Sequence, residues 1–104
     1  MNLNEYKKIR KLNYNEYCKY LQEKYGVPQG SYFLTESCES KNNEIKRGNT
    51  EGLFIHHIKE DEAIMLSKPE VAILNPFEFQ QGYNLVYCDF LEHLLLHILI
   101  IEKH

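Results

Sequence analysis

The sequence contains no tryptophan, few cysteines and no long apolar run, and the last two shortages each exclude a class of protein. The longest apolar stretch, 94–101, is interrupted by His97 and is too short to span a bilayer. No apolar segment resembling a signal peptide follows the first residues. The three cysteines, Cys18, Cys38 and Cys88, form no Cys-x-x-Cys pair. This pattern excludes a zinc ribbon or a disulfide framework, and it indicates reduced thiols in a cytoplasmic protein.

Glycine and arginine are also scarce. The five glycines do not form the Gly-x-Gly-x-x-Gly spacing that a dinucleotide-binding fold requires, and no arginine lies in residues 48–104. The remaining composition is that of a small globular protein, with 104 residues, 43% of them hydrophobic and 26% charged. These values predict one domain over 1–104, and they exclude a disordered chain or a multidomain enzyme.

Charge is divided unequally between the two halves of the chain. Residues 1–50 carry 9 Lys or Arg against 6 Asp or Glu, whereas residues 51–104 carry 3 against 9. The acidic half alone does not fit a nucleic-acid-binding surface, because phosphate binding requires a high density of cations. It can instead hold a metal ion, or be offset by the basic half.

Local signals in the first half predict one well-defined helix. Asn13 and Glu16 have the spacing of a capping box, and Gly26 stands where a helix ends, so we expect a helix over 14–25. We expect residues 4–12 to form a short helix or an arm. Residues 35–50 are polar and are predicted to form a loop.

The second half predicts two short strands followed by a helix. Apolar and β-branched residues indicate strands near 52–58 and 83–88. Asp89 is a suitable N-cap for a helix over about 90–101. The acidic run 60–62 is interpreted as a solvated turn, and the alternative is that one of its carboxylates supplies an oxygen ligand to a metal ion.

Four of the five histidines lie on these predicted elements. His93 and His97 are four residues apart, so they stand on one face of the helix and can share a metal ion. His56 and His57 are adjacent on the first strand, so their side chains point to opposite faces. We expect the fifth, His104, to belong to a frayed end of the chain.

This arrangement resembles the HNH, or ββα-metal, nuclease superfamily, and its spacing is most similar to that of the colicin-type DNases. The resemblance covers residues 52 to about 101. It includes the His56–His57 pair on a strand, Asn84 nine positions before His93, and His97 four positions later. It implies an α+β fold in which an N-terminal helix packs on a ββα-metal core. Residues 1–51 would form the helical region with its polar loop, and 52–104 the core.

The resemblance also implies a role for each of these residues. His57 would be the general base that activates water, and Asn84 would fix the loop between the strands and help to orient His57. His56, His93 and His97 would hold one divalent metal ion with a coordination position left open. Histidine ligands suit Zn²⁺ or Ni²⁺ better than Mg²⁺, although Mg²⁺ and Mn²⁺ are kept as alternatives.

The leading hypothesis is therefore a metal-dependent HNH-type endonuclease, a hydrolase that acts on phosphodiester bonds of nucleic acid, with DNA the expected substrate. Contacts to phosphate would come from basic residues that carry no sequence information. The candidate basic residues are Lys7, Lys8, Arg10, Lys11, Lys41, Lys46 and Arg47. Two features depart from the family pattern: 27 positions separate His57 from Asn84, and the loop lacks the family's frequent glycine pair.

Two alternatives concern the absence of catalysis and the extent of the chain. In the first, the fold is a catalytically inactive binding module, for example a phage-encoded inhibitor of a host defence nuclease, whose acidic surface mimics DNA. In the second, the apolar helix near the end of the chain is covered by the N-terminal helix, by a second copy or by residues of a longer protein. No membrane partner is expected.

Overall fold

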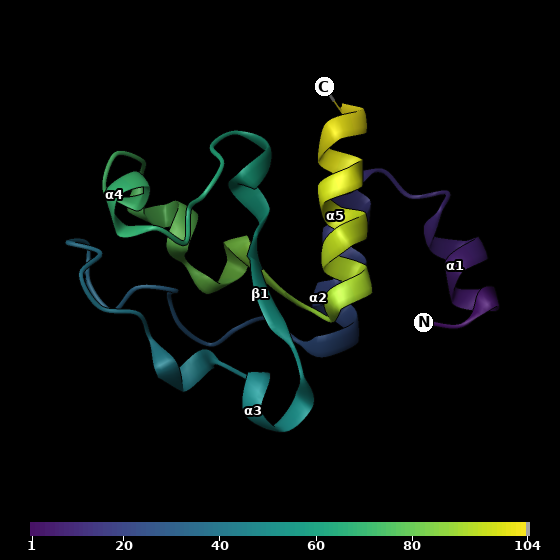
Figure 1. The fold of residues 1–104 in the computed structure, drawn as a ribbon, viewed down its shortest axis with the longest axis horizontal. Coiled ribbons are helices and arrows are strands. Elements are labelled where there is room, and N and C mark those ends of the chain that lie inside the picture. The colour runs from purple at the N-terminus through teal and green to yellow at the C-terminus, as the bar shows by residue number, and fades with distance from the viewer. Residues whose placement is uncertain (104) are drawn as a thin grey trace.

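The computed structural model describes residues 1–103, and His104, expected to be frayed, lies outside them. The chain forms helices, two strands and several 3-10 turns (Figure 1). The helices are α1 (Leu3–Ile9), α2 (Tyr14–Tyr25), α3 (Gly48–Glu51), α4 (Pro69–Ala72) and α5 (Phe90–Lys103), and the strands are β1 (Phe54–His57) and β2 (Leu85–Cys88). The 3-10 turns are Asn43–Ile45, Ile58–Asp61, Phe77–Gln80 and Gly82–Asn84.

The predicted helix over 14–25 is confirmed as α2, with the expected residue at each end. The Asn13 side chain accepts a hydrogen bond from the Glu16 amide, and the Glu16 carboxylate accepts one from the Asn13 amide. Gly26 then leaves the helix at a φ of 86°, a conformation that glycine adopts without a steric penalty. Residues before α2 form the short helix α1 rather than an extended arm.

The two strands pair antiparallel, and α5 follows β2 directly. Phe54 is opposite Cys88, and His57 is opposite Leu85. Asp89 and Glu92 exchange backbone-to-side-chain hydrogen bonds of 2.8 Å, which start α5 at the predicted position. The predicted α+β fold, an N-terminal helix packed on a ββα core, is therefore confirmed.

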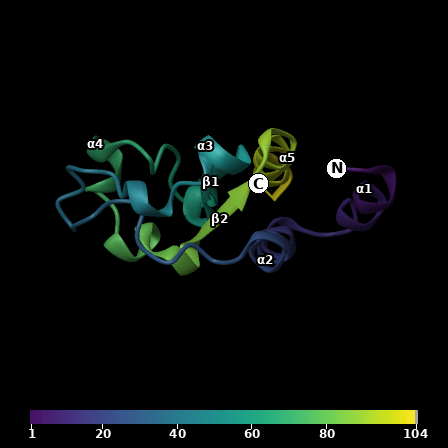
Figure 2. The same ribbon diagram turned by 90° about the horizontal axis from the view of Figure 1, so that it is seen from below.

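The main core lies where α2 and α5 cover the same side of the hairpin. In Figure 2, α2 and α5 lie next to each other and β2 points toward them, and α2 contacts both β2 and α5. The buried apolar residues of this core are Ile9, Tyr14, Tyr17, Cys18, Leu21, Val86, Cys88 and Leu96. Because α2 packs against the hairpin and α5 together, it fixes the angle between them.

The connection between β1 and β2 is a folded insert. A second small cluster of Phe33, Cys38 and Ala72 ties it to the long loop of the first half. The interpretation of 60–62 as a solvated turn holds for Glu62, which is exposed, but not for Glu60 and Asp61. The Glu60 carboxylate accepts hydrogen bonds from two backbone amides of the insert, and Asp61 is nearly buried and paired with Lys103. Within residues 1–103, no helix has the length and apolar character needed to cross a membrane.

Candidate metal centre

Three histidines from β1 and α5 converge on one point. His56 comes from β1, and His93 and His97 come from successive turns of α5. Each offers one ring nitrogen, and these nitrogens lie within 4.8 Å of one another. The ring centroids of His56 lie 5.4 Å from His93 and 5.3 Å from His97. The predicted ligand trio is thus brought together, and it is able to hold a metal ion.

The spacing of His93 and His97 suits a shared cation. Their Nε2 atoms lie 3.1 Å apart. Two nitrogens bound tetrahedrally to one Zn²⁺ at about 2.0–2.1 Å would be about 3.3–3.4 Å apart, so only a small adjustment is needed. At this distance the two Nε2 atoms form a hydrogen bond, so one of them carries the hydrogen and the other accepts it. A bound cation would take the place of that hydrogen.

Burial keeps His56 in the neutral form that binds metals. His56 is 2% exposed, while His93 is half-buried and His97 lies at the surface. Burial, together with the neighbouring His93 and His97, holds the pKa of His56 well below its usual range. Burial also lowers the pKa of His93, with His97 adding to the effect. The site is therefore closed on the His56 side and open to solvent on the His97 side.

Tyr14, at the start of α2, determines which nitrogen of His56 is available. Its hydroxyl lies 2.6 Å from the Ile58 carbonyl oxygen and 2.8 Å from His56 Nε2. A carbonyl only accepts, so the single hydroxyl hydrogen goes to Ile58. His56 Nε2 must then carry its own hydrogen and donate it to the hydroxyl oxygen. The free electron pair of His56 is consequently on Nδ1, which is the atom able to bind a metal ion.

Glu92 fixes the first turn of α5 against α2, one residue before His93. Its carboxylate is 1% exposed and accepts hydrogen bonds of 2.7 Å from Lys24 Nζ and from the Tyr25 hydroxyl. Lys24 also pairs with Glu5. A buried carboxylate with these partners is expensive to displace, so the rotation of α5 and the direction of His93 are well defined.

His57, the neighbour of His56 on β1, is held by the insert and by the Tyr32 ring. Its Nε2 lies 2.6 Å from Gln80 Oε1, and Gln80 Nε2 donates to the Leu66 carbonyl oxygen at 3.0 Å. The second bond places the amide nitrogen toward Leu66, so His57 Nε2 donates to Gln80 and Nδ1 holds the free electron pair. Burial, with a contribution from Lys41, lowers the pKa of His57 to about 4, although the Gln80 bond opposes the shift.

Asn84 acts on the loop between the strands. Its Nδ2 donates to the Glu78 carbonyl oxygen at 2.8 Å, which closes the end of the insert. In residues 1–103 no hydrogen bond joins Asn84 to His57, and Gln80 supplies the contact to that ring instead. The long insert thus provides the residue that orients His57. Neither Gln80 nor Tyr14 was identified from the sequence, because no local motif marks either residue.

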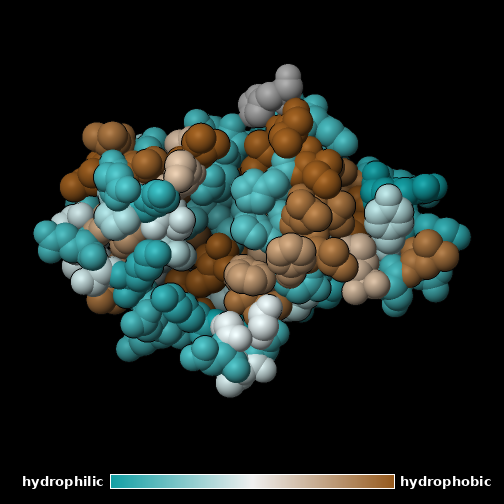
Figure 3. Space-filling model, viewed as in Figure 1, coloured by the Kyte–Doolittle hydropathy of each residue, from teal (hydrophilic) through white to brown (hydrophobic). Residues whose placement is uncertain are grey.

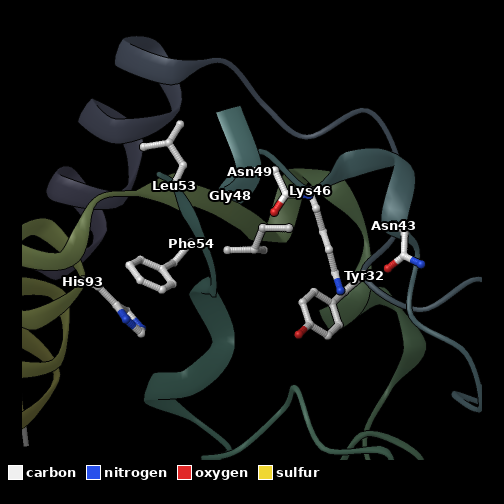
Figure 4. A pocket seen from close by; sticks show the side chains of 9 residues that line it. Tyr32, Asn43, Lys46, Gly48, Asn49, Leu53, Phe54 and His93 are labelled. Carbon is white, nitrogen blue, oxygen red and sulfur yellow. The ribbon is translucent and has the colours of Figure 1, made fainter. Parts of the chain in front are cut away.

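The four histidines line one cavity of about 290 Å³. Glu60 and Ser67 contribute its polar atoms, and apolar side chains of the insert close it. A larger cleft of about 670 Å³ shares His93 and Ile55 with it. Its wall carries Lys46, as Figure 4 shows.

The predicted phosphate-binding residues fall into three groups. Lys7 and Lys8 lie on α1, and Arg10 and Lys11 directly follow it, on the other side of α5 from β1 (Figures 1 and 2). Arg47 is engaged in internal contacts, described next. Lys41 and Lys46 lie on the side of the histidines.

The contacts of Arg47 are structural. Its guanidinium pairs with Glu51, donates to the Tyr25 carbonyl oxygen at 2.7 Å and lies 4.6 Å from the centre of the Tyr87 ring. Lys41 Nζ lies 5.6 Å from the centre of the Tyr32 ring, which itself packs on His57. Of the predicted cations, Lys41 and Lys46 are thus the two placed beside the site.

Comparisons with protein-family models, with curated proteins and with solved structures give no significant match to this chain, so its site is interpreted from its own residues.

Proposed function

We propose that this chain is a metal-dependent endonuclease of the HNH type that hydrolyses phosphodiester bonds of nucleic acid. The observation that carries the proposal is the common cavity lined by the trio His56, His93 and His97 together with His57. A fourth histidine beside a metal-competent trio provides a base near a bound phosphate without occupying a ligand position.

His57 Nδ1 is the atom proposed to accept a proton from the attacking water. The Gln80 contact fixes the ring and places the hydrogen on the opposite nitrogen. Because the pKa of His57 is about 4, the ring is unprotonated at neutral pH, as a base must be. Its low basicity is offset in part if the water is acidified on binding.

The metal ion would supply the charge that the protein side chains lack. A divalent cation held by the trio would neutralise charge on the scissile phosphate and on the leaving oxygen. Three imidazole ligands favour Zn²⁺ or Ni²⁺, whereas Mg²⁺ and Mn²⁺ prefer sites with more oxygen ligands. The open side at His97 leaves room for a phosphate oxygen or water.

The proposal is tested by cleavage of supercoiled plasmid and of a single-stranded oligonucleotide with metal-stripped protein. Zn²⁺, Ni²⁺, Mg²⁺ and Mn²⁺ are added back separately, and His57→Ala and His97→Ala variants are assayed in parallel. We expect nicking that requires metal and is lost in both variants, with metal binding weakened only by His97→Ala. Absence of cleavage of both substrates by folded, metal-loaded protein, or full activity of His57→Ala, would refute the proposal.

A second candidate function, a non-catalytic binding module, is favoured by the exposed apolar surface of α5. Figure 3 shows apolar side chains gathered over this helix. The exposed residues are Phe90, Leu91, Leu94, Ile98 and Ile101. An apolar patch of this kind is typical of contact with a protein partner or with a second copy of the chain. Metal-dependent stability without nicking would favour this candidate.

A further inference from the structure

The larger cleft beside the metal site is built like a pocket for a flat, anionic ligand. Its volume of about 670 Å³ is within the range of ligand sites in proteins, about 300–1,000 Å³. Figure 4 shows the Phe54 ring next to His93 at one side of the cleft and Tyr32 with Lys46 at the other. The two sides come from segments far apart in the chain, β1 and the loop of the first half.

Each aromatic wall touches a histidine of the proposed active site. Phe54 is 49% exposed, and its ring lies nearly parallel to that of His93, with a centroid distance of 6.0 Å and an interplanar angle of 23°. Tyr32 meets the His57 ring edge-on at 4.6 Å. A ligand ring placed between these two aromatic side chains would therefore lie next to His93 and His57, the histidines proposed to take part in cleavage.

Charge in the cleft selects for an anion. No carboxylate is among its lining residues, and within the described part of the chain no acidic residue pairs with Lys46. Lys41, over the Tyr32 ring, adds a second cation nearby. The amides of Asn43 and Asn49 line the same cleft, and an amide can donate to and accept from the edge of a nucleobase.

We propose that this cleft binds one unpaired nucleotide next to the scissile phosphate, so that the substrate is single-stranded nucleic acid. This inference rests on the proposed nuclease function and names its substrate class. The faces of a base that is paired and stacked in a duplex are covered, so it cannot stack on Phe54 or Tyr32 without being extruded. An unpaired base stacks on an aromatic side chain at no such cost, while Lys46 contacts the phosphate.

Binding is measured by fluorescence anisotropy with the Zn²⁺-loaded His57→Ala protein. This variant is used because it is not expected to cleave the probe. The probes are an oligonucleotide of about 12 residues, as DNA and as RNA, and the same sequence as a duplex. We expect at least about tenfold tighter binding of a single strand than of the duplex. The DNA and RNA arms identify which single strand is preferred.

Two substitutions in the cleft are compared with two matched ones outside it. Phe54→Leu removes the stacking ring and is expected to weaken single-strand binding about tenfold. Lys46→Gln is expected to weaken binding and to reduce its salt dependence by about one phosphate contact. Phe79→Leu and Lys68→Gln, which do not line the cleft, should leave binding unchanged. The Zn²⁺ affinity of each variant is measured as well, to exclude that a substitution weakens nucleic-acid binding by disturbing the metal ligand His93.

Duplex binding as tight as single-strand binding, or equal binding by the cleft variants and their controls, would overturn the inference. These results are distinct from failure of the proposed function. Cleavage of duplex with no preference for single strands would contradict the substrate class and retain the nuclease. Single-strand binding through Phe54 and Lys46 without metal-dependent cleavage would support the cleft and refute the nuclease.

Discussion

The hydroxyl of Tyr14 lies 2.8 Å from Nε2 of His56, and the direction of this hydrogen bond is determined by a second one. The same hydroxyl gives its only hydrogen to the Ile58 carbonyl oxygen, so His56 must donate. A residue in the first turn of α2 thereby leaves the Nδ1 atom of His56 as the one that can bind a metal ion. The helix α2 is thus part of the candidate metal centre as well as a cover for the core.

Replacing Tyr14 with phenylalanine should weaken metal binding while preserving the fold. The ring still fills the core, but the hydrogen on His56 is no longer tied to Nε2. Loss of such an outer contact typically costs about 10- to 100-fold in metal affinity. Affinity is measured by competition of Zn²⁺ with a chromophoric chelator.

Tyr17→Phe is the matched control on the same helix. Tyr17 is 1% exposed, and its hydroxyl has no hydrogen-bond partner within the described chain. Removing that hydroxyl should leave Zn²⁺ affinity unchanged. Equal affinities for the two variants would show that the Tyr14 hydroxyl does not act on the metal site.

Gln80→Leu should reduce cleavage without changing metal affinity. The substitution frees the His57 ring, and we expect the rate to fall about 10- to 100-fold, as for loss of other orienting contacts. It also removes the donor to the Leu66 carbonyl oxygen, which should cost about 1–3 kcal/mol of stability. If Gln80 acts through His57, the same substitution made in His57→Ala protein has no further effect on rate. A full additional loss in that background would contradict the assignment.

Stability of the metal-free protein should fall on acidification. Below pH 6.5 the unfolded chain protonates His57, whereas the folded protein does not do so until about pH 4. The unfolded state therefore binds more protons in this window, and stability is lost as pH falls through it. From pH 7 to pH 5, His57 alone should account for about 2 kcal/mol.

The contribution of His57 is isolated by urea unfolding of the wild-type protein and of His57→Gln at pH 7 and pH 5, both with chelator. The burial of His56 and His93 acts in the same direction and is retained in both proteins. The wild-type protein should lose more stability than the variant. An equal loss in the two proteins would mean that His57 is not held in its neutral form by the fold.

Metal addition should raise the melting temperature, because the three ligands are assembled only in the folded chain. A free metal concentration about 100 times the dissociation constant adds about 2.7 kcal/mol. For a domain of this size each kcal/mol corresponds to about 4–8 °C, so we expect a rise of about 10–20 °C. A melting curve with Zn²⁺ that overlays the curve with chelator would be inconsistent with a site at these histidines.

Local sequence signals were sufficient for the two long helices, α2 and α5, and for the order of the histidines, but not for the short helices α3 and α4. The capping residues Asn13 and Asp89 act within a few residues of themselves, so their effect is visible in the sequence. The spacing of His93 and His97 likewise reflects one helical turn. Tyr14 and Gln80 could not be assigned, because their partners are 42 and 23 positions away. Such contacts depend on how α2 and the insert pack, which no local pattern encodes.

The central claim is that one metal ion is bound by His56, His93 and His97, and X-ray absorption of the Zn²⁺-loaded protein tests it most directly. We predict one ion per chain, three imidazole nitrogens at about 2.0–2.1 Å and an additional oxygen ligand. In His97→Ala protein, the spectrum should show loss of one imidazole, or the ion should be lost. A wild-type protein that retains no stoichiometric ion, or a spectrum unchanged by His97→Ala, would contradict the account.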